Sequence, residues 1–129
     1  MAPKIKILAV DDEEFYLDIM IEYLEAAGYE VIAADDGDTA LQKLEEHPDV
    51  AVVVLDRMMP RMNGMDVLKK ILADPRFRAI PVILQTAAAT PVQVMEGVQA
   101  GAYAYISKPY EDNELLSIVA NAYNSKKQQ

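Results

Sequence analysis

The sequence predicts an α/β domain built on a doubly wound parallel sheet. Five short apolar runs alternate with five segments in which apolar residues recur at helical spacing. The run Val50–Leu55 is apolar at every position, which is typical of a parallel strand covered by helices on both faces. Strict alternation of strand and helix then implies right-handed crossovers within one sheet.

The predicted strands are Ile5–Val10, Val31–Ala34, Val50–Leu55, Ile80–Leu84 and Ala102–Ile106. The first helix carries a stripe of Leu17, Met20, Ile21 and Leu24, followed by Gly28 as a C-terminal cap. The second has a shorter stripe of Ala40, Leu41 and Leu44. The third carries Val67, Leu68, Ile71 and Leu72 and ends at Asp74-Pro75, because proline cannot continue a helix.

The sequence predicts the fourth helix less strongly than the fifth. The fourth is predicted from Val94, Met95 and Val98, with Pro91 near its start and Gly101 past its end. Its weak point is Gly97, which costs about 1 kcal/mol relative to alanine inside a helix. The fifth carries Leu115, Ile118, Val119 and Ala122, with a second apolar flank of Leu116, Ala120 and Tyr123 that suits core packing, a partner or a dimer. The polar residues 125–129 are expected to form a frayed tail after a domain core of about 4–124.

Length and composition limit the classes of protein to which the chain can belong. The 129 residues suit one domain, and 52% hydrophobic with 26% charged residues argues against disorder. The net charge of -9 disfavours direct nucleic-acid binding, and the lack of cysteine excludes disulfides and thiolate sites. The apolar run near the N-terminus is too short for a signal peptide or a membrane span. We therefore expect a soluble, cytoplasmic protein.

Polar residues follow four of the five runs, at the edge where parallel sheets form their sites. The first run ends at Asp11-Asp12-Glu13 and the third at Asp56. The fourth ends at Gln85-Thr86-Ala87 and the fifth at Ser107-Lys108-Pro109. If the strands are neighbours, three aspartates, a hydroxyl and an ammonium group converge there.

Crowded carboxylates repel one another unless they are protonated or neutralised by a cation. Oxygen ligands alone favour a hard ion such as Mg²⁺, with Mn²⁺ as an alternative. Asp11 and Asp12 could instead be helix caps or turn residues, an interpretation that fits Asp56 poorly. No glycine-rich phosphate loop follows the first run, and the only histidine, His47, lies in a loop segment away from the strand ends.

These residues resemble the receiver domains of two-component response regulators, the family that includes the chemotaxis response regulator. The resemblance extends over residues 4 to 124. The matching segments, in order and at the spacing of the family, are Val10-Asp11-Asp12-Glu13, Asp36-Gly37, Ala40-Leu41, Leu55-Asp56-Arg57-Met58-Met59-Pro60, Gly64, Pro81 to Ala87 and Gly101 to Pro109.

The resemblance implies a flavodoxin-like five-stranded sheet in the order 2-1-3-4-5. It implies Asp56 as the phosphoacceptor, with Asp11, Asp12, Asp56 and the Met58 backbone carbonyl as ligands of Mg²⁺. Lys108 is similar to the lysine that pairs with the phosphoryl group. Thr86 and Tyr105 match the switch pair and Ala87 the small residue beside the phosphoryl site. The Lys108-Pro109 bond is often cis in this family.

The expected function is a phosphorylation switch rather than an enzyme that turns over a metabolite. A histidine kinase or phosphotransfer protein would donate from phosphohistidine to Asp56, whose carboxylate needs no deprotonation at neutral pH. The face formed by the fourth helix, fifth strand and fifth helix would then bind an output protein or domain, as a monomer or a phosphorylation-dependent dimer. No membrane partner is expected.

Two alternatives stay open at this point. The chain could be a receiver-fold adaptor that binds without phosphorylation, or an Mg²⁺-dependent aspartyl phosphotransferase, although few residues are spare to build a substrate pocket. Arg57, beside the acceptor, is a departure from the usual family pattern; it either forms a local salt bridge or lies in solvent. Met58 and Ala88 offer no polar group to orient a water, so dephosphorylation is expected to be slow.

Overall fold

The chain folds into one five-stranded parallel sheet with helices on both faces. The computed structural model describes residues 3–87 and 89–127. Its elements are β1 (Lys6–Val10), α1 (Glu14–Ala26), β2 (Glu30–Ala34), α2 (Gly37–Glu46), β3 (Val52–Asp56), α3 (Gly64–Ala73), β4 (Val82–Thr86), α4 (Pro91–Gln99), β5 (Ala104–Ser107) and α5 (Asp112–Lys127). The strand order is β2-β1-β3-β4-β5, as the family resemblance implied.

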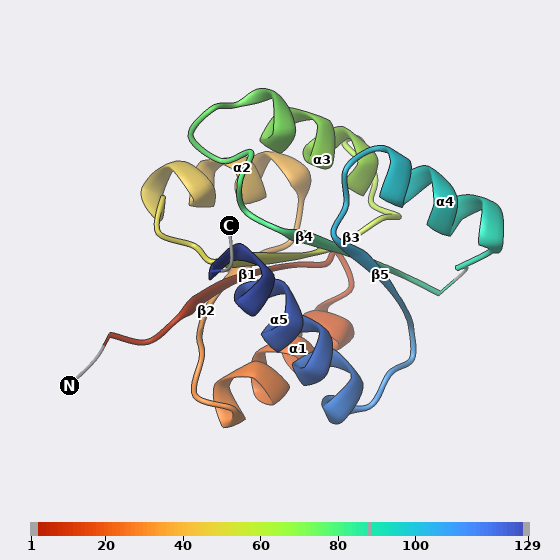
Figure 1. Ribbon diagram of the computed structural model, residues 1–129. Coiled ribbons are helices and arrows are strands. Elements are labelled where there is room, and N and C mark those ends of the chain that lie inside the picture. The colour runs from red at the N-terminus through yellow and green to blue at the C-terminus, as the bar shows by residue number, and fades with distance from the viewer. Residues whose placement is uncertain (1–2, 88, 128–129) are drawn as a thin grey trace.

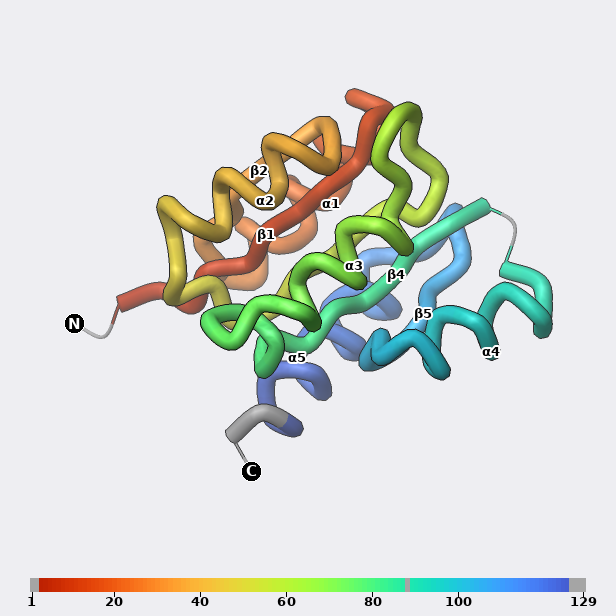
Figure 2. Tube along the Cα trace, turned by 90° about the horizontal axis from the view of Figure 1, so that it is seen from above, coloured from red at the N-terminus to blue at the C-terminus, as the bar shows by residue number. Residues whose placement is uncertain are grey.

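The helices form two layers around the sheet. Helices α2, α3 and α4 lie on one face, and α1 and α5 lie on the other (Figure 1). Viewed from above, α2, α3 and α4 cross in front of the strands in the order of the sheet (Figure 2). No helix of the described segments has the length and apolar character that a membrane crossing requires.

The two layers explain why the central strand is apolar at every position. Side chains of successive strand residues point to opposite faces. Val53 and Leu55 therefore pack in the core beneath α2 and α3, whereas Val52 and Val54 pack in the core beneath α1 and α5. All four side chains are fully buried, so β3 is the centre of both cores.

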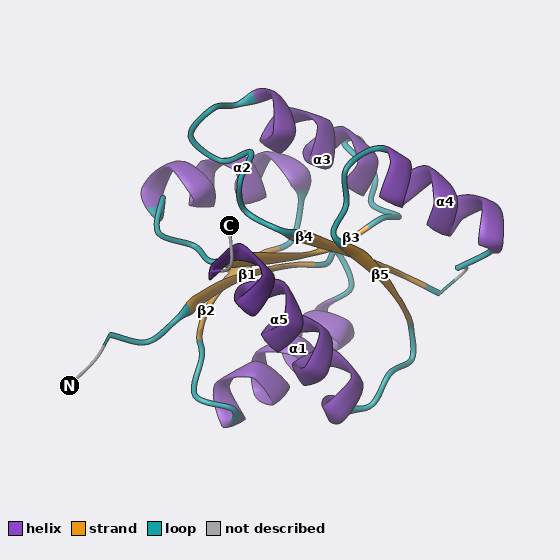
Figure 3. Ribbon diagram, in the orientation of Figure 1, coloured by secondary structure: helices purple, strands orange, loops and turns teal. Residues whose placement is uncertain are grey.

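The strands β3 and β4 extend further into the site than the sequence predicted. Both begin two residues later than expected, because the N–H groups of Val50 and Ile80 bond to carbonyls of the preceding turns. At their other ends, the pairing of Asp56 with Gln85 continues the ladder. Asp56 and Thr86 are consequently the last residues of strands rather than the first residues of loops. Figure 3 shows the strands as the middle layer between the helices.

One contact of α4 was not predicted, and one prediction about α5 needs correction. Gly97 is buried in α4, and a Cβ at this position would come within 3.0 Å of Leu84 and Tyr105, so this glycine allows α4 to approach the sheet closely. The expected frayed tail at residues 125–129 is wrong over its first part. Helix α5 continues to Lys127, because the segment contains no glycine or proline to end it. Residues 128 and 129 lie outside the described part.

Candidate functional site

Three carboxylates meet at the carboxyl ends of β1 and β3. Asp11 and Asp12 follow β1, and Asp56 is the last residue of β3. Each residue offers an oxygen, and these oxygens lie within 4.8 Å of one another. Asp11 and Asp56 are buried, whereas Asp12 is exposed. The sequence-predicted acidic residues are thus brought together, in a cluster that is open to solvent on the Asp12 side.

Lys108 supplies the positive charge of this cluster. It follows β5, and its Nζ atom lies 2.8 Å from Asp11 Oδ2 and 3.6 Å from Asp56 Oδ1. Its side chain is only 3% exposed. The same nitrogen lies 4.2 Å from the centroid of the Tyr16 ring and 3.5 Å from Glu13 Oε1. The Lys108-Pro109 peptide bond is cis, as expected from the resemblance.

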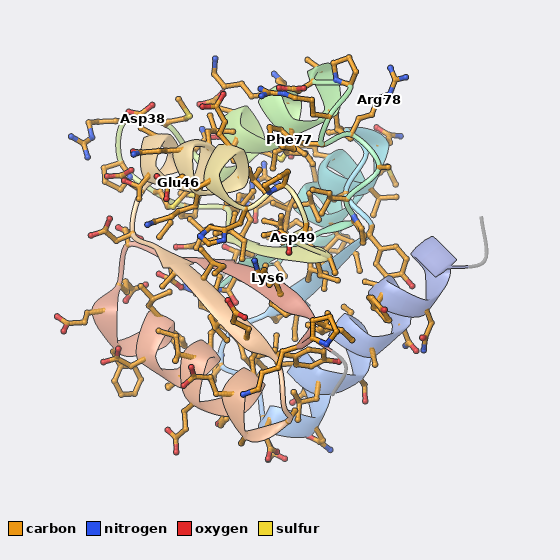
Figure 4. All side chains as sticks on the ribbon, turned by 90° about the vertical axis from the view of Figure 1, so that its left-hand side faces the viewer. Lys6, Asp38, Glu46, Asp49, Phe77 and Arg78 are labelled. Atoms are coloured by element: carbon orange, nitrogen blue, oxygen red, sulfur yellow. The ribbon has the colours of Figure 1, made fainter. Side chains whose placement is uncertain are left out.

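The opposite end of the sheet holds a very different ion pair. Lys6 Nζ lies 3.0 Å from Asp49 Oδ2, and Figure 4 shows both side chains near the start of β1. Asp49 is largely exposed, so solvent screens the attraction and the pair contributes little to stability. Among the described residues, opposite charges are buried together at the carboxyl ends of the strands and not in this pair, which distinguishes the acidic cluster from an ordinary surface pair.

The buried charges do not balance. Burial and the negative charge of Asp11 raise the pKa of Asp56, the charge of Lys108 lowers it only in part, and the net result is a pKa of about 7. Burial alone would lower the pKa of Lys108, but its hydrogen bond to Asp11 and the charges of Asp56, Asp11 and Glu13 raise it overall. Because the pKa of Asp56 is raised, the expectation that this carboxylate needs no deprotonation at neutral pH stays a prediction, which a bound cation would favour.

A divalent cation fits this arrangement. All the side-chain donors of the cluster are carboxylate oxygens, which suit a hard ion, and one ammonium group leaves negative charge uncompensated. The Met58 N–H donates to Asp56 Oδ1 at 3.3 Å, so the Met58 backbone lies beside the acceptor carboxylate. His47, which was not expected to belong to the site, lies at the C-terminal end of α2.

The other predicted site residues lie on β4 and β5. Thr86 is buried at the end of β4 and is paired with Ser107 across the sheet. Ala87 is exposed just beyond it, and Tyr105 is half-buried on β5. Ala88 lies outside the described residues, so the expected slow dephosphorylation stays a prediction. The roles assigned to Thr86, Ala87 and Tyr105 are likewise predictions.

Comparison with known proteins decides the family. The chain matches the family described as "Response regulator receiver domain" over residues 7–120. The chain belongs to this family. It is 40% identical over 106 residues to the chemotaxis protein CheY1 of Helicobacter pylori, covering 81% of this chain and 86% of that protein. The chain is also 38% identical over 112 residues to the transcriptional regulatory protein CpxR of Escherichia coli. That match covers 87% of this chain and 46% of CpxR.

Solved structures give the same result. The chemotaxis protein CheY4 of Vibrio cholerae superposes on this receiver domain with a TM-score of 0.88 at 30% sequence identity. The match covers 93% of this chain and 99% of that one. Receiver domains of two-component regulators are phosphorylation-based signalling switches rather than classical enzymes, and this receiver domain shares that function.

Sequence reasoning left the position of Arg57 open, and the structure resolves it. The Arg57 guanidinium donates from Nη1 to the Gln93 carbonyl at 3.0 Å and to the Tyr105 hydroxyl at 3.3 Å. Its Nη2 lies 3.5 Å from Glu96 Oε1. The residue next to the acceptor in the receiver domain is thus bonded to α4 and β5. The direction of a long side chain could not be read from sequence spacing.

Sequence analysis also missed a buried polar pair beside the cluster. Gln85 Nε2 donates to Asp11 Oδ2 at 2.9 Å, and the Tyr110 hydroxyl donates to Gln85 Oε1 at 2.7 Å. Both residues are buried. Burial and the charge of Asp11 raise the pKa of the Tyr110 phenol. A glutamine at the end of an otherwise apolar run was the available indication.

Gly64 lies against the backbone of Asp56 and Arg57, so alanine at this position should displace the acceptor residue. A Cβ at Gly64 would collide with the Asp56 carbonyl oxygen and lie 2.7 Å from Arg57 Cα. Because backbone atoms must shift, we expect Gly64→Ala to cost about 1–3 kcal/mol of unfolding free energy in urea titrations. It should also slow phosphorylation of Asp56.

The matched control is Gly28→Ala at the end of α1. Gly28 has a φ of 95° but open space around its Cβ position. Alanine there should cost about 1 kcal/mol through backbone strain alone and leave phosphorylation unchanged. Equal phosphorylation rates in the two variants would contradict the supporting position of Gly64.

Proposed function

We propose that this receiver domain accepts a phosphoryl group on Asp56 from the phosphohistidine of a histidine kinase or phosphotransfer protein. Asp11, Asp12, Asp56 and the Met58 carbonyl would hold Mg²⁺, or Mn²⁺ in its place. The observation that carries the proposal is the Lys108 ammonium group, buried between Asp11 and Asp56 in a cluster of three carboxylates. The domain assignment, residues 1–129 as one receiver domain, is part of the same proposal.

The arrangement suits transfer to an aspartate. As the Asp56 oxygen forms a bond to phosphorus, the P–N bond of the donor breaks and the imidazole leaves. Negative charge spreads over the phosphoryl oxygens, so positioning and positive charge provide most of the acceleration. A bound Mg²⁺ would neutralise part of that charge and favour the ionised form of Asp56. Lys108 is held beside the Asp56 carboxylate by its contact with Asp11 and by the ring of Tyr16.

The test is phosphorylation by a small-molecule phosphodonor with and without Mg²⁺, followed by intact-mass measurement. We expect one phosphoryl group per chain, only with the metal present. An adaptor that acts without phosphorylation would gain none. An aspartyl phosphotransferase or phosphatase would turn over phosphate esters, so a panel of such esters should show no release of phosphate. The cytoplasmic location stays a prediction.

The output face is proposed to be α4-β5-α5. The helix α4 exposes Val92, Met95 and Val98, and Tyr103 before β5 is partly exposed. On α5, Leu116 and Tyr123 pack partly against the core, which leaves less of that flank for a partner than the sequence suggested. We propose that phosphorylation turns the Thr86 hydroxyl toward the phosphoryl group and moves Tyr105, so that this face gains affinity for an output protein, domain or second copy.

Arg57 should hold α4 in place in the unphosphorylated state. Removing its bonds to Gln93 and Tyr105 in Arg57→Ala should lower the local stability of α4 by about 1–1.5 kcal/mol. Amide hydrogen exchange across residues 91–99 should then be about tenfold faster, with exchange in α1 unchanged.

The control for this prediction is Arg78→Ala. Arg78 is exposed and points away from the body of the molecule (Figure 4). It should leave exchange in α4 at the wild-type rate. Unchanged exchange in α4 of Arg57→Ala would show that the arginine contacts do not restrain this helix.

A further inference from the structure

A chain of buried hydrogen bonds reaches the acidic cluster from the side of the core. It starts at the Tyr110 hydroxyl, passes through the Gln85 amide and ends at Asp11 Oδ2. Gln85 and Asp11 are completely buried, and Tyr110 is 8% exposed. Tyr110 lies between β5 and α5, far in sequence from the two residues that it helps to orient.

The chemistry of the three groups fixes the direction of every bond. An ionised carboxylate only accepts hydrogen bonds, so the Gln85 NH₂ group must face Asp11. The amide oxygen then faces Tyr110, whose phenol is protonated at neutral pH and can donate to it. Each polar atom thereby has a partner, and neither Gln85 nor Tyr110 can rotate without losing one.

Asp11 is held on both of its oxygens. Oδ2 accepts from Gln85 and from Lys108 Nζ, and Oδ1 accepts from the Glu13 N–H at 2.8 Å. The orientation of Asp11 in turn places the Lys108 ammonium group beside Asp56. The main chain of Gln85 adds a second restraint, because its carbonyl accepts from the Arg57 N–H next to the acceptor.

A core of this kind does not require a glutamine. Ile83, two residues earlier on the same face of β4, packs in this core with an apolar side chain. An apolar residue at position 85 would avoid the cost of burying an amide. The polar residue is therefore explained by what it contacts, which is a carboxylate of the site.

We propose that Gln85 is a positioning residue of the phosphoacceptor site, oriented by Tyr110, and that it sets the affinity of the acidic cluster for a divalent cation. This inference rests on the proposed function, in which Asp11 is a ligand of that cation. Groups that orient metal ligands through hydrogen bonds typically change metal affinity by about 10–100-fold when they are removed.

The test uses three variants and Mg²⁺ alone as the probe. Gln85→Met keeps the volume of the side chain but removes both hydrogen bonds. Tyr110→Phe keeps the ring and removes only the hydroxyl. The double variant Gln85→Met/Tyr110→Phe removes both partners, so no buried hydroxyl is left without an acceptor, and its melting temperature should stay close to the wild-type value.

We expect calorimetric titration at fixed pH to give about tenfold weaker Mg²⁺ binding for the double variant. The effect for Tyr110→Phe should be about threefold, because the amide remains but can rotate. The Mg²⁺ concentration for half-maximal phosphorylation should rise in parallel. Gln42→Met, an exposed substitution on α2, should bind Mg²⁺ normally.

The outcomes separate this inference from the proposed function. Wild-type Mg²⁺ affinity in both Tyr110→Phe and the double variant would overturn the positioning role, even if phosphorylation proceeds. Because Tyr110→Phe keeps every apolar contact, it gives an answer even if the Gln85 variants do not fold. Weaker Mg²⁺ binding without phosphorylation of any variant or the wild type would support the positioning role and refute the proposed function. A wild type that binds no Mg²⁺ would overturn both.

Discussion

Asp56→Asn is expected to abolish phosphorylation and to make the metal-free domain more stable. Both effects have the same origin, the burial of an anionic nucleophile beside Asp11. The variant should gain no phosphoryl group under conditions in which the wild type gains one. In urea titrations at pH 8 with a metal chelator, its free energy of unfolding should exceed that of the wild type by about 2–4 kcal/mol.

The sign follows from the pKa of Asp56. Burial and the nearby charge of Asp11 raise this pKa from 3.8 to about 7 in the folded state, so the folded protein holds the proton more tightly than the unfolded chain does. The ionised carboxylate therefore destabilises the fold increasingly between about pH 4 and pH 7, and fully above that range. Asparagine removes this penalty, so its advantage should be small near pH 4 and largest at pH 8.

A matched control is Asp18→Asn on the exposed surface of α1. It should change neither phosphorylation nor the pH dependence of stability. Added Mg²⁺ should reduce the advantage of Asp56→Asn, because the ion binds the folded wild type and stabilises it. A phosphoryl group on Asp56→Asn, or a loss of stability at pH 8, would contradict the assigned position and charge of the acceptor.

The fold and the acidic cluster could be predicted because both follow from local patterns. The fully apolar run before Asp56 identified the central strand, and parallel strands carry the residues that follow them to a common edge. Asp11 and Lys108 follow strands of the same sheet, so they were expected at that edge, but their distance from Asp56 depends on which strands are neighbours. The order of the strands came from the family resemblance, since alternation alone does not determine which strands are neighbours.

The remaining features depend on contacts between distant parts of the chain. Gln85 and Tyr110 meet only because the segment before α5 packs against the end of β4. The bonds of Arg57 require the carbonyl of Gln93 to be presented by α4. The raised pKa of Asp56 is a consequence of burial, which no residue spacing reports. These features depend on how elements distant in sequence pack against one another.

Lys108→Met should have the second large effect, because it removes the only cation that the described residues place in contact with Asp11 and Asp56. Breaking a buried ion pair from one side leaves the other charge uncompensated, at a typical cost of about 3–5 kcal/mol. Two carboxylates are affected here, since Lys108 Nζ lies 2.8 Å from Asp11 and 3.6 Å from Asp56. The phosphorylation rate should fall by about 10²–10³, the usual loss when one donor to a developing oxyanion is removed.

The pH and metal dependence distinguish this loss from a simple packing defect. Without the ammonium group, the folded-state pKa of Asp56 should rise, so the destabilisation should be greatest above pH 7 and shrink as Asp56 takes up a proton in acid. Mg²⁺ should restore part of the stability by supplying positive charge. Lys70→Met, an exposed change on α3, should stay within about 0.5 kcal/mol of the wild type. A destabilisation of Lys108→Met that is independent of both pH and Mg²⁺ would mean that Lys108 acts through its apolar stem rather than through its charge.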